Sequence, residues 1–311
     1  MKRTNLALVL TVILLTGALS GCGSKAVSSD AGQQTAAASS EAAQQSEFTE
    51  PSTVPAAEAS SSSGTDSTDL TVIKGIADLV PHSEIIEFVE PQLEAQGYKV
   101  ELVATASDET TNEKLANGEI DFDYFQHWPY LKAWNETNGY DLVDAGDIHI
   151  EPITAYSDKY VSTDEIPENA VVAIPNDGTN EYRALRILEQ NGFIKLDSST
   201  ADSLSATTSD ITEYTKPIKI VEIDSAQIIP TKDDYDFFIT NTNKALEAKI
   251  TSNKLFSEGS DSPYANIIAT RPEDKDNPAI VALVKALQSD ETKKFIEEKY
   301  NGAVIPAGTA K

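Results

Sequence analysis

The hydrophobic positions of the chain alternate between two spacings from residue 70 onward. Runs rich in β-branched residues, which are typical of strands, are followed by stretches in which apolar residues recur every three or four positions, which are typical of helices. The first strands and helices are predicted, in alternation, at 70–77, 84–96, 98–105, 109–117 and 119–125. This βαβαβ order predicts an α/β fold with a mostly parallel sheet covered by helices.

A second set of elements follows the same alternation. A strand at 170–177 leads into a helix at 179–190, which Gly192 closes. Asn277 and Pro278 have the N-cap and first-position chemistry of a helix start. Further extended runs are predicted at 140–146, 148–157, 218–223, 235–240 and 265–270.

The two sets predict two lobes with a ligand cleft between them. One lobe is expected to comprise 70–155 and 266–311, and the other 156–265. Open α/β sheets bind ligands beyond the carboxyl ends of their strands, so the cleft is expected there. The polar stretch 197–217 is predicted to be a surface excursion with one short helix after Asp210.

The N-terminus has the layout of an export signal. Lys2 and Arg3 precede a mostly apolar run at 6–19, which is shorter than the roughly 20 residues of a membrane-spanning helix. Leu19-Ser20-Gly21-Cys22 then matches the bacterial lipobox, so we predict a leader at 1–21 and a lipid on Cys22. The alternative is an ordinary cleaved leader with an incidental cysteine.

The segment 22–69 is expected to be a disordered tether behind the lipidated cysteine. Its Ser, Ala, Thr, Gln, Glu and Gly residues offer too little apolar surface to offset the entropy of ordering. Two or more acyl chains hold a protein stably at a bilayer. The folded part is therefore predicted to be tethered to the cell membrane on its extracytoplasmic face.

The charge of the chain excludes some partners. The 311 residues carry a net charge of −26, and loss of Lys2 and Arg3 with the leader leaves 22 − 50 = −28. Such a surface repels nucleic acid and anionic lipid headgroups, so attachment to a membrane must be covalent or transmembrane. With 40% hydrophobic residues, the chain has enough apolar surface for real cores.

Catalytic and metal motifs are weak. The histidines His82, His127 and His149 show no metal-ligand spacing, although a zinc site could gather all three in space. Asp121 and Asp123 share a strand face, but paired acids are common in a chain with fifty acidic residues. The sequence therefore predicts no enzyme, no metal site and no cofactor.

Polar residues are placed where strands feed helices. The stretch "IPNDGTNEYRAL" (174–185) puts Asn176, Asp177, Thr179 and Asn180 at such a turn, and Arg183 follows one turn later. An arginine fork and helix N-terminal amides both bind carboxylates. Asn241 follows the strand 235–240 and offers both a donor and an acceptor. This set suits an amino acid zwitterion; the alternative is simple helix capping and a surface ion pair.

Six motifs, in matching order, carry a resemblance to a known family. The chain resembles the NlpA lipoproteins, the substrate-binding lipoproteins of methionine uptake, from about residue 70 to 306. The motifs are "VPHSEII" (80–86), "NGEIDFDYFQHWPYL" (117–131), "HIEPITAYS" (149–157), "AIPNDGTNEYRAL" (173–185), "DSPYANIIATR" (261–271) and "EEKYNGAVIP" (297–306). The resemblance implies a two-lobed periplasmic-binding-protein fold, type II-like, and a monomer that closes on a free amino acid and delivers it to an ABC permease and its ATPase.

The resemblance also implies site residues. Phe125 and His127, in the ring-dense stretch "DFDYFQHWPYL" (121–131), match residues that line the pocket around the methionine side chain. Arg183 matches the arginine that binds the ligand carboxylate. Asn241 and Asn266 match the asparagines that hold the backbone amino and carboxylate groups. Of the other rings, Phe122 is expected in the core, and Trp128 and Tyr130 are expected to pack the following helix.

One position departs from the family pattern. Asp108 stands where family members usually carry a Tyr, and "GIADLVPH" (75–82) differs from the usual start of the pocket. A carboxylate there penalises an apolar ligand and favours a polar or cationic one, unless the loop has slipped and Asp108 points to solvent. Methionine or a close analogue is the expected ligand. The competing functions are a lipid-anchored zinc-binding protein and a surface adhesin.

Overall fold

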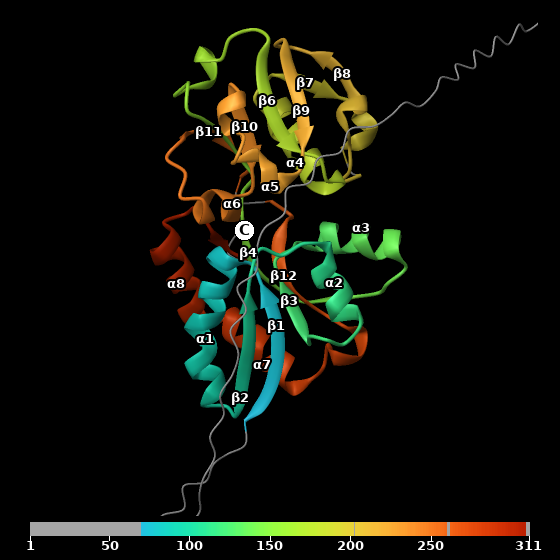
Figure 1. The fold of residues 1–311 in the computed structure, drawn as a ribbon, viewed down its shortest axis with the longest axis vertical. Helices are drawn as coiled ribbons and strands as arrows, with labels where there is room; N and C mark the ends of the chain where they lie inside the picture. Colours follow the sequence, from blue (N-terminus) through green and yellow to red (C-terminus); the bar gives the residue numbers. More distant parts are fainter. Residues whose placement is uncertain (1–69, 202, 260–261, 309–311) are drawn as a thin grey trace, which may run out of the picture. The chain divides into compact units, whose positions relative to one another are not determined.

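The computed structural model describes residues 70–201, 203–259 and 262–308. The predicted leader, Cys22 and the tether 22–69 lie outside these residues. Within them, two β-sheets each carry helices on both faces, which confirms the α/β prediction (Figure 1). Among the same residues, no helix is long and apolar enough to cross a membrane.

The first sheet has six strands in the order β13-β4-β12-β3-β1-β2. Its strands are β1 (Thr71–Ala77), β2 (Tyr98–Ala104), β3 (Phe122–Tyr124), β4 (Val143–Ile150), β12 (Ala265–Thr270) and β13 (Ile305–Pro306). β1 pairs in parallel with both β2 and β3, as the βαβαβ order predicts. β12 runs antiparallel to both of its neighbours, β3 and β4, so the sheet is mixed.

Helices cover both faces of this sheet. α1 (Glu84–Glu94), α7 (Pro278–Leu287) and α8 (Asp290–Tyr300) contribute to one core, and α2 (Glu109–Ala116) and α3 (Trp128–Asn138) cover the other face. Ile267 and Ile268 on β12 are both fully buried and belong to opposite cores. Since successive strand residues point to opposite faces, an unbroken apolar run such as "ANIIAT" marks a strand buried on both sides. The predicted N-cap of α7 is confirmed: the Asn277 side chain accepts a hydrogen bond from the Ala279 amide.

The second sheet has five strands in the order β11-β5-β10-β6-β9. They are β5 (Thr154–Ser157), β6 (Ala170–Pro175), β9 (Ile218–Ile223), β10 (Phe237–Thr240) and β11 (Asn253–Ser257), and the associated helices are α4 (Gly178–Gln190), α5 (Ser225–Ile228) and α6 (Thr242–Glu247). β6 pairs in parallel with β9 and β10, whereas β5 is antiparallel to β10 and β11. The chain therefore passes between the sheets after β4 and again before β12. The residue boundaries of the lobes stay a prediction.

The prediction of a short helix after Asp210 is wrong. Residues Ile211–Tyr214 form strand β8, which pairs antiparallel with β7 (Ile194–Leu196). The 3-10 turn at Thr208–Asp210 ends at Asp210. Pairing with β7 supplies the backbone hydrogen bonds that a helix would otherwise make internally, and the local sequence carries no sign of that partner.

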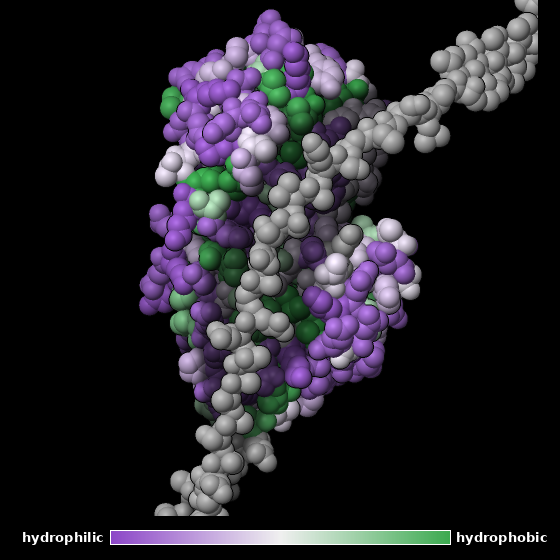
Figure 2. Space-filling view, in the orientation of Figure 1, coloured by the Kyte–Doolittle hydropathy of each residue, from purple (hydrophilic) through white to green (hydrophobic). Residues whose placement is uncertain are grey.

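The molecular surface agrees with the acidic, polar composition. In Figure 2 most of the visible surface of the described residues is hydrophilic, and hydrophobic residues are confined to small separate areas. The exposed large hydrophobic residues, among them Trp128 and Val161, are scattered along the sequence. Single exposed apolar residues are normal in soluble domains.

Candidate functional site

A cavity of about 540 Å³ lies where the parallel strands of both sheets end. Its lining includes the residue that directly follows each of five strands: Asp78 after β1, Phe125 after β3, Asn176 after β6, Asp224 after β9 and Asn241 after β10. Helix α2 and the loop before it contribute Ser107, Asp108 and Thr110. The cavity thus occupies the position that the carboxyl-end rule predicts for a ligand.

The ring-dense stretch divides between core and cavity. Phe122 is fully buried, as expected, and its ring lies so close to Gly75 that a Cβ at that position would be 2.1 Å from the ring. Phe125 and His127 line the cavity. Tyr130 differs from the expectation, because it lines the cavity with its ring centroid 6.2 Å from that of Phe125. Trp128 is 40% exposed, and its packing on the helix stays a prediction.

His127 is held in one orientation by its surroundings. It caps α3, and its Nδ1 accepts a hydrogen bond from the Tyr130 amide at 3.2 Å, which leaves the proton of the neutral ring on Nε2. The Tyr264 ring packs against it edge-on, with 5.0 Å between centroids. Burial and the positive charge of Arg183 lower the pKa of His127 to about 3. His127 is therefore a neutral hydrogen-bond donor at physiological pH.

Arg183 is 1% exposed and is bound by a carboxylate of the same chain. Its Nε and Nη2 donate to the two carboxylate oxygens of Glu258 at 2.9 and 2.6 Å. Nη2 also donates to the Glu151 carbonyl at 2.8 Å, and the guanidinium carbon lies 4.5 Å from the centre of the Tyr264 ring. The edge that carries Nη1 is directed to Asn180 Oδ1, at 3.3 Å. Arg183 thus stands behind Asn180, which lines the cavity.

Glu258 was not among the residues that sequence reasoning identified. It lies 75 positions after Arg183, directly after β11 in a segment without a distinctive pattern, and fifty acidic residues are present in the chain. Because Glu258 binds the guanidinium edge that carries Nε and Nη2, only the edge that carries Nη1 is free of a carboxylate.

The asparagine side chains form a connected network at the ends of β6 and β10. Asn241 Nδ2 donates to Asn180 Oδ1 at 3.0 Å, and Asn180 Nδ2 donates to Asp177. The Asp177 side chain caps α4 by accepting from the Asn180 amide at 3.0 Å. Capping is therefore one role of this turn, as the alternative interpretation held, and the same residues also line the cavity.

The sequence left open whether Asp108 faces the pocket or the solvent, and the structure shows both. Its side chain is exposed and also borders the cavity. It caps α2, accepting from the Thr110 amide at 2.9 Å and the Thr110 hydroxyl at 2.6 Å. These hydrogen bonds, led by that from the hydroxyl, lower the pKa of Asp108. Asp108 therefore places a negative charge at the edge of the cavity.

We expect Asp108→Ala to lower the free energy of unfolding by about 1 kcal/mol, because the first turn of α2 loses its cap. Asp108→Ser keeps a capping oxygen and is expected to stay within about 0.5 kcal/mol of the parent chain. Urea unfolding monitored by circular dichroism measures both. Equal losses for the two variants would contradict a capping role.

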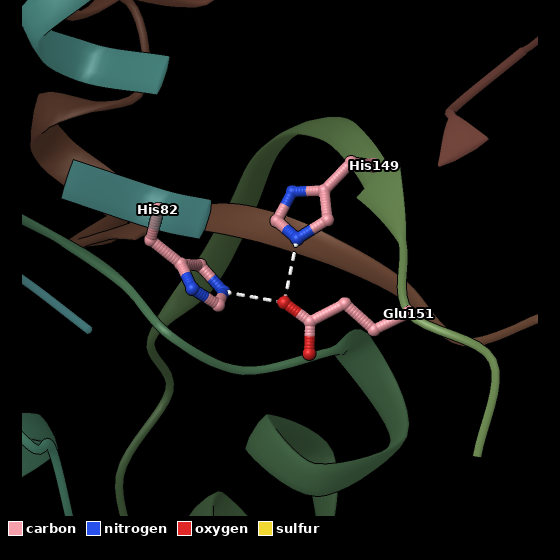
Figure 3. A group of neighbouring side chains, drawn as sticks. All are labelled: His82, His149 and Glu151. Atoms are coloured by element: carbon pink, nitrogen blue, oxygen red, sulfur yellow. Dashed lines mark hydrogen bonds and ion pairs between the residues drawn. The ribbon is translucent and has the colours of Figure 1, made fainter. Parts of the chain in front are cut away.

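Two of the three histidines converge beside the cavity (Figure 3). His149 Nε2 lies 2.9 Å from Glu151 Oε1, and His82 Nε2 lies 3.6 Å from the same oxygen. The second nitrogen of His149 is hydrogen-bonded to the Tyr124 hydroxyl. Burial lowers the pKa of His149 to about 3 and also lowers the pKa of His82.

This group differs from the three-histidine zinc site considered from the sequence. Among the described residues, the atoms able to hold a metal belong to His82, His149 and Glu151, so Glu151 stands where His127 was required. Tetrahedral zinc keeps its ligand atoms about 3.4 Å apart, given Zn–N bonds of 2.0–2.1 Å. The three atoms here are separated by 2.9 Å at the closest and by up to 4.8 Å, which is the geometry of a hydrogen-bonded chain.

Asn266 links the histidines to the cavity. It lines the cavity, forms a backbone bridge with His127, and its Oδ1 lies 3.2 Å from His82 Nε2. All six predicted residues are therefore at or near one site: five line the cavity, and Arg183 lies directly behind it. Their contacts with a ligand stay a prediction.

Asp121 and Asp123 do not act as a pair. Asp121 bonds to Arg271 and to the Lys74 amide, whereas Asp123 is fully buried and accepts from Gln126 Nε2 at 2.9 Å. The cavity is also lined by residues that the sequence analysis did not identify, among them Asp78, Glu151 and Asn243.

Two α/β lobes with a polar cavity at the carboxyl ends of their strands define a substrate-binding protein of the two-lobed periplasmic class. More specifically, the chain belongs to the NlpA lipoprotein family, whose model matches residues 75–308. The family and the fold inferred from the sequence are thereby confirmed.

Relatives and solved structures agree with this assignment. The methionine-binding lipoprotein MetQ of Bacillus subtilis is 36% identical over 237 residues, which are 74% of this chain and 86% of the relative. The D-methionine-binding lipoprotein MetQ of Salmonella typhi is 39% identical over 216 residues, 68% of this chain and 79% of the relative. A nutrient-binding protein of Burkholderia cenocepacia, solved with bound methionine, is 38% identical with a TM-score of 0.72, covering 76% of this chain and 99% of that one.

Proposed function

We propose that this chain is the lipid-anchored substrate-binding protein of an ABC importer. It captures a free amino acid, methionine or a close analogue, and delivers it to a permease driven by an ATPase. It acts as a monomer, attached through Cys22 to the extracytoplasmic face of the cell membrane.

The observation that carries this proposal is the composition of the cavity. Rings from Phe125 and Tyr130 come from the part of the chain that builds the six-stranded sheet, whereas the amides of Asn180, in the first turn of α4, and Asn241, directly after β10, belong to the other sheet and its helices. A thioether packs favourably against aromatic faces and edges, whereas a carboxylate needs donors. Relatives named for methionine binding, and a solved relative that holds methionine, support the same ligand class.

The ligand carboxylate is expected at the Nη1 edge of Arg183, because Glu258 occupies the other edge. Asn241, whose Nδ2 also donates to Asn180 Oδ1, and His127, whose ring proton is on Nε2, are further donors among the residues that line the cavity. A neutral histidine donates one hydrogen bond without adding a charge that would compete with Arg183.

Titration calorimetry tests the proposal. The full chain, purified in detergent and stripped of carried-over ligand by unfolding and refolding, is titrated with the twenty amino acids, with D-methionine and with short peptides. Saturable binding with one methionine per chain is the expected result. Tighter binding of lysine or arginine than of methionine would assign specificity to the charge of Asp108. Failure of every amino acid and peptide to bind would contradict the transport function.

A further inference from the structure

The residues that line the cavity carry more acidic than basic groups. Lys244 contributes one ammonium group, against five carboxyl groups, which belong to Asp78, Asp108, Glu151, Asp177 and Asp224. Lys244 Nζ lies 3.5 Å from Asp78 Oδ2, and the guanidinium of Arg183, behind the cavity, is paired with Glu258. The positive groups at the cavity are therefore already matched. The excess of carboxyl groups favours a ligand that brings a positive charge beyond that of a neutral zwitterion.

The charge of Asp108 is not matched by an ion pair among the described residues. Its hydrogen-bond donors are the amide and the hydroxyl of Thr110, which are neutral, and both bonds go to Oδ1. Oδ2 is therefore left for a ligand. The loop that carries Asp108 is fixed to the six-stranded sheet, because the Ser107 amide donates to Asp78 Oδ1 at 2.6 Å.

Two aromatic rings of the cavity come from the same part of the fold as Asp108. Phe125 directly follows β3, and Tyr130 lies in the first turn of α3. Their ring centroids are 6.2 Å apart at an interplanar angle of 76°, so one ring presents an edge to the face of the other and the pair is not stacked. Ring faces attract cations, and methylated onium groups are the cations that aromatic sites typically recognise.

The side chain of an amino acid ligand is expected among these groups. Its carboxylate is expected at the Nη1 edge of Arg183, which belongs to the other sheet and its helices. From there the side chain reaches across the cavity to Phe125 and Asp108. A neutral thioether would use the rings and leave the carboxylate of Asp108 without a partner.

The rings and Asp108 suit a cation without N–H bonds better than an ammonium or a guanidinium group. A primary ammonium carries three donors and a guanidinium five, and each donor that loses its water needs an acceptor. The Phe125 ring has no lone pair to offer, and Oδ1 of Asp108 already accepts twice. A sulfonium group has no N–H bond, and its positive charge is spread over the carbon atoms attached to sulfur, which pack against ring faces.

We propose that the preferred ligand of this cavity is a sulfonium amino acid, represented by S-methyl-L-methionine. The positive sulfur lies against the rings of Phe125 and Tyr130 and pairs with the carboxylate of Asp108. This inference rests on the proposed function, and it names the analogue of methionine that the side-chain end of the cavity selects. The backbone groups of the ligand are the same as those of methionine, so the inference concerns the side chain alone.

Titration calorimetry with two ligands of one shape tests the inference. S-Methyl-L-methionine and L-homoleucine differ only in that a positive sulfur replaces a neutral CH group. The full chain, purified in detergent and refolded free of ligand, is expected to bind S-methylmethionine at least about tenfold more tightly than homoleucine. S-Methylmethionine is also expected to bind more tightly than L-methionine and L-lysine.

Matched variants assign the preference to particular residues. Asp108→Asn removes the charge and keeps a side chain suited to the N-cap, and it is expected to lower the ratio of the two affinities at least about threefold. Phe125→Leu removes the ring and keeps an apolar side chain, with the same expected loss. Asp141→Asn, at an exposed position that does not line the cavity, is the control, and its ratio is expected to equal that of the parent chain.

The ratio distinguishes recognition of the charge from a general loss of structure. A variant that merely loosens the cavity weakens two ligands of the same shape alike, so its ratio does not change. Asp108→Ser, which also keeps a capping oxygen, replaces Asp108→Asn if that variant fails to fold.

The outcomes separate this inference from the proposed function. The sulfonium preference is refuted, while amino acid binding stands, by a ratio below about tenfold in the parent chain or by tighter binding of methionine or lysine than of S-methylmethionine. A loss of ratio below about threefold in Asp108→Asn or in Phe125→Leu refutes it as well. If the parent chain binds no amino acid at all, the proposed function and this inference are refuted together.

Discussion

Arg183→Ala is expected to lower the free energy of unfolding by about 3–5 kcal/mol, the cost of removing one partner of a buried ion pair. The reason is Glu258, whose side chain is 12% exposed and accepts two hydrogen bonds from the guanidinium. Without Arg183, its carboxylate is left with the Ile153 amide and the Ser262 hydroxyl as donors. Urea unfolding at pH 7 measures the loss, and a change below about 1 kcal/mol would show that the pair behaves as a surface ion pair.

A double variant separates the structural role of Arg183 from its proposed role in binding. Arg183→Met with Glu258→Gln removes both charges and keeps an acceptor for the Ile153 amide. Replacing both members of a buried pair is often close to neutral, so the double variant is expected to regain at least half of the lost stability. It is not expected to regain methionine binding. Binding at the affinity of the parent chain would remove Arg183 from the carboxylate site.

Asp123→Asn is expected to change how stability depends on pH. Asp123 is fully buried at the centre of the six-stranded sheet, and its Oδ2 has no hydrogen-bond partner in the described part of the chain. Burial raises the pKa of Asp123 from 3.8 to about 8. The folded chain therefore keeps this proton between pH 4 and pH 8, whereas the unfolded chain releases it.

The sign follows from linkage. Because the unfolded state binds fewer protons in this window, the contribution of Asp123 to stability falls as pH rises from 4 to 8 and is level above that. Asparagine does not titrate and can still accept from Gln126, so the variant is expected to gain on the order of 4 kcal/mol relative to the parent across this range. Urea unfolding at pH 4.5, 6, 7 and 8 provides the comparison. Asp141→Asn, at an exposed position, is the control, and a pH-independent difference between parent and Asp123→Asn would contradict the prediction.

The elements with strong local signals could be predicted closely from the sequence. Strand β12 has the predicted bounds Ala265–Thr270, and α7 starts at Pro278 behind its Asn277 cap. The helix expected after Asp210 became strand β8, because its partner β7 lies about twenty residues away and leaves no mark on the local pattern.

For the site, the sequence predicted the placement of residues better than their partners. Asn241 and the Asn176 turn could be placed at the cavity because each directly follows a strand, and parallel strands end at a shared edge. The contacts that decide their chemistry join distant positions: Arg183 to Glu258 over 75 residues, and Asp78 to Asn243 over 165. The spacing of apolar residues along the chain predicts local helices and strands, but it does not predict contacts between residues so far apart in the sequence.

The sequence by itself determined the class of this protein. Alternating strand and helix patterns, capping residues and six ordered motifs were sufficient for an α/β substrate-binding fold of the NlpA lipoprotein family, since these signals depend on neighbours within a few residues. Only the tertiary structure decided the electrostatics of the cavity. In the folded chain Arg183 pairs with Glu258, whereas the neighbours of Glu151 are two neutral histidines. The strength of a charge depends on burial and on its partners, and only the fold brings these partners within hydrogen-bond distance.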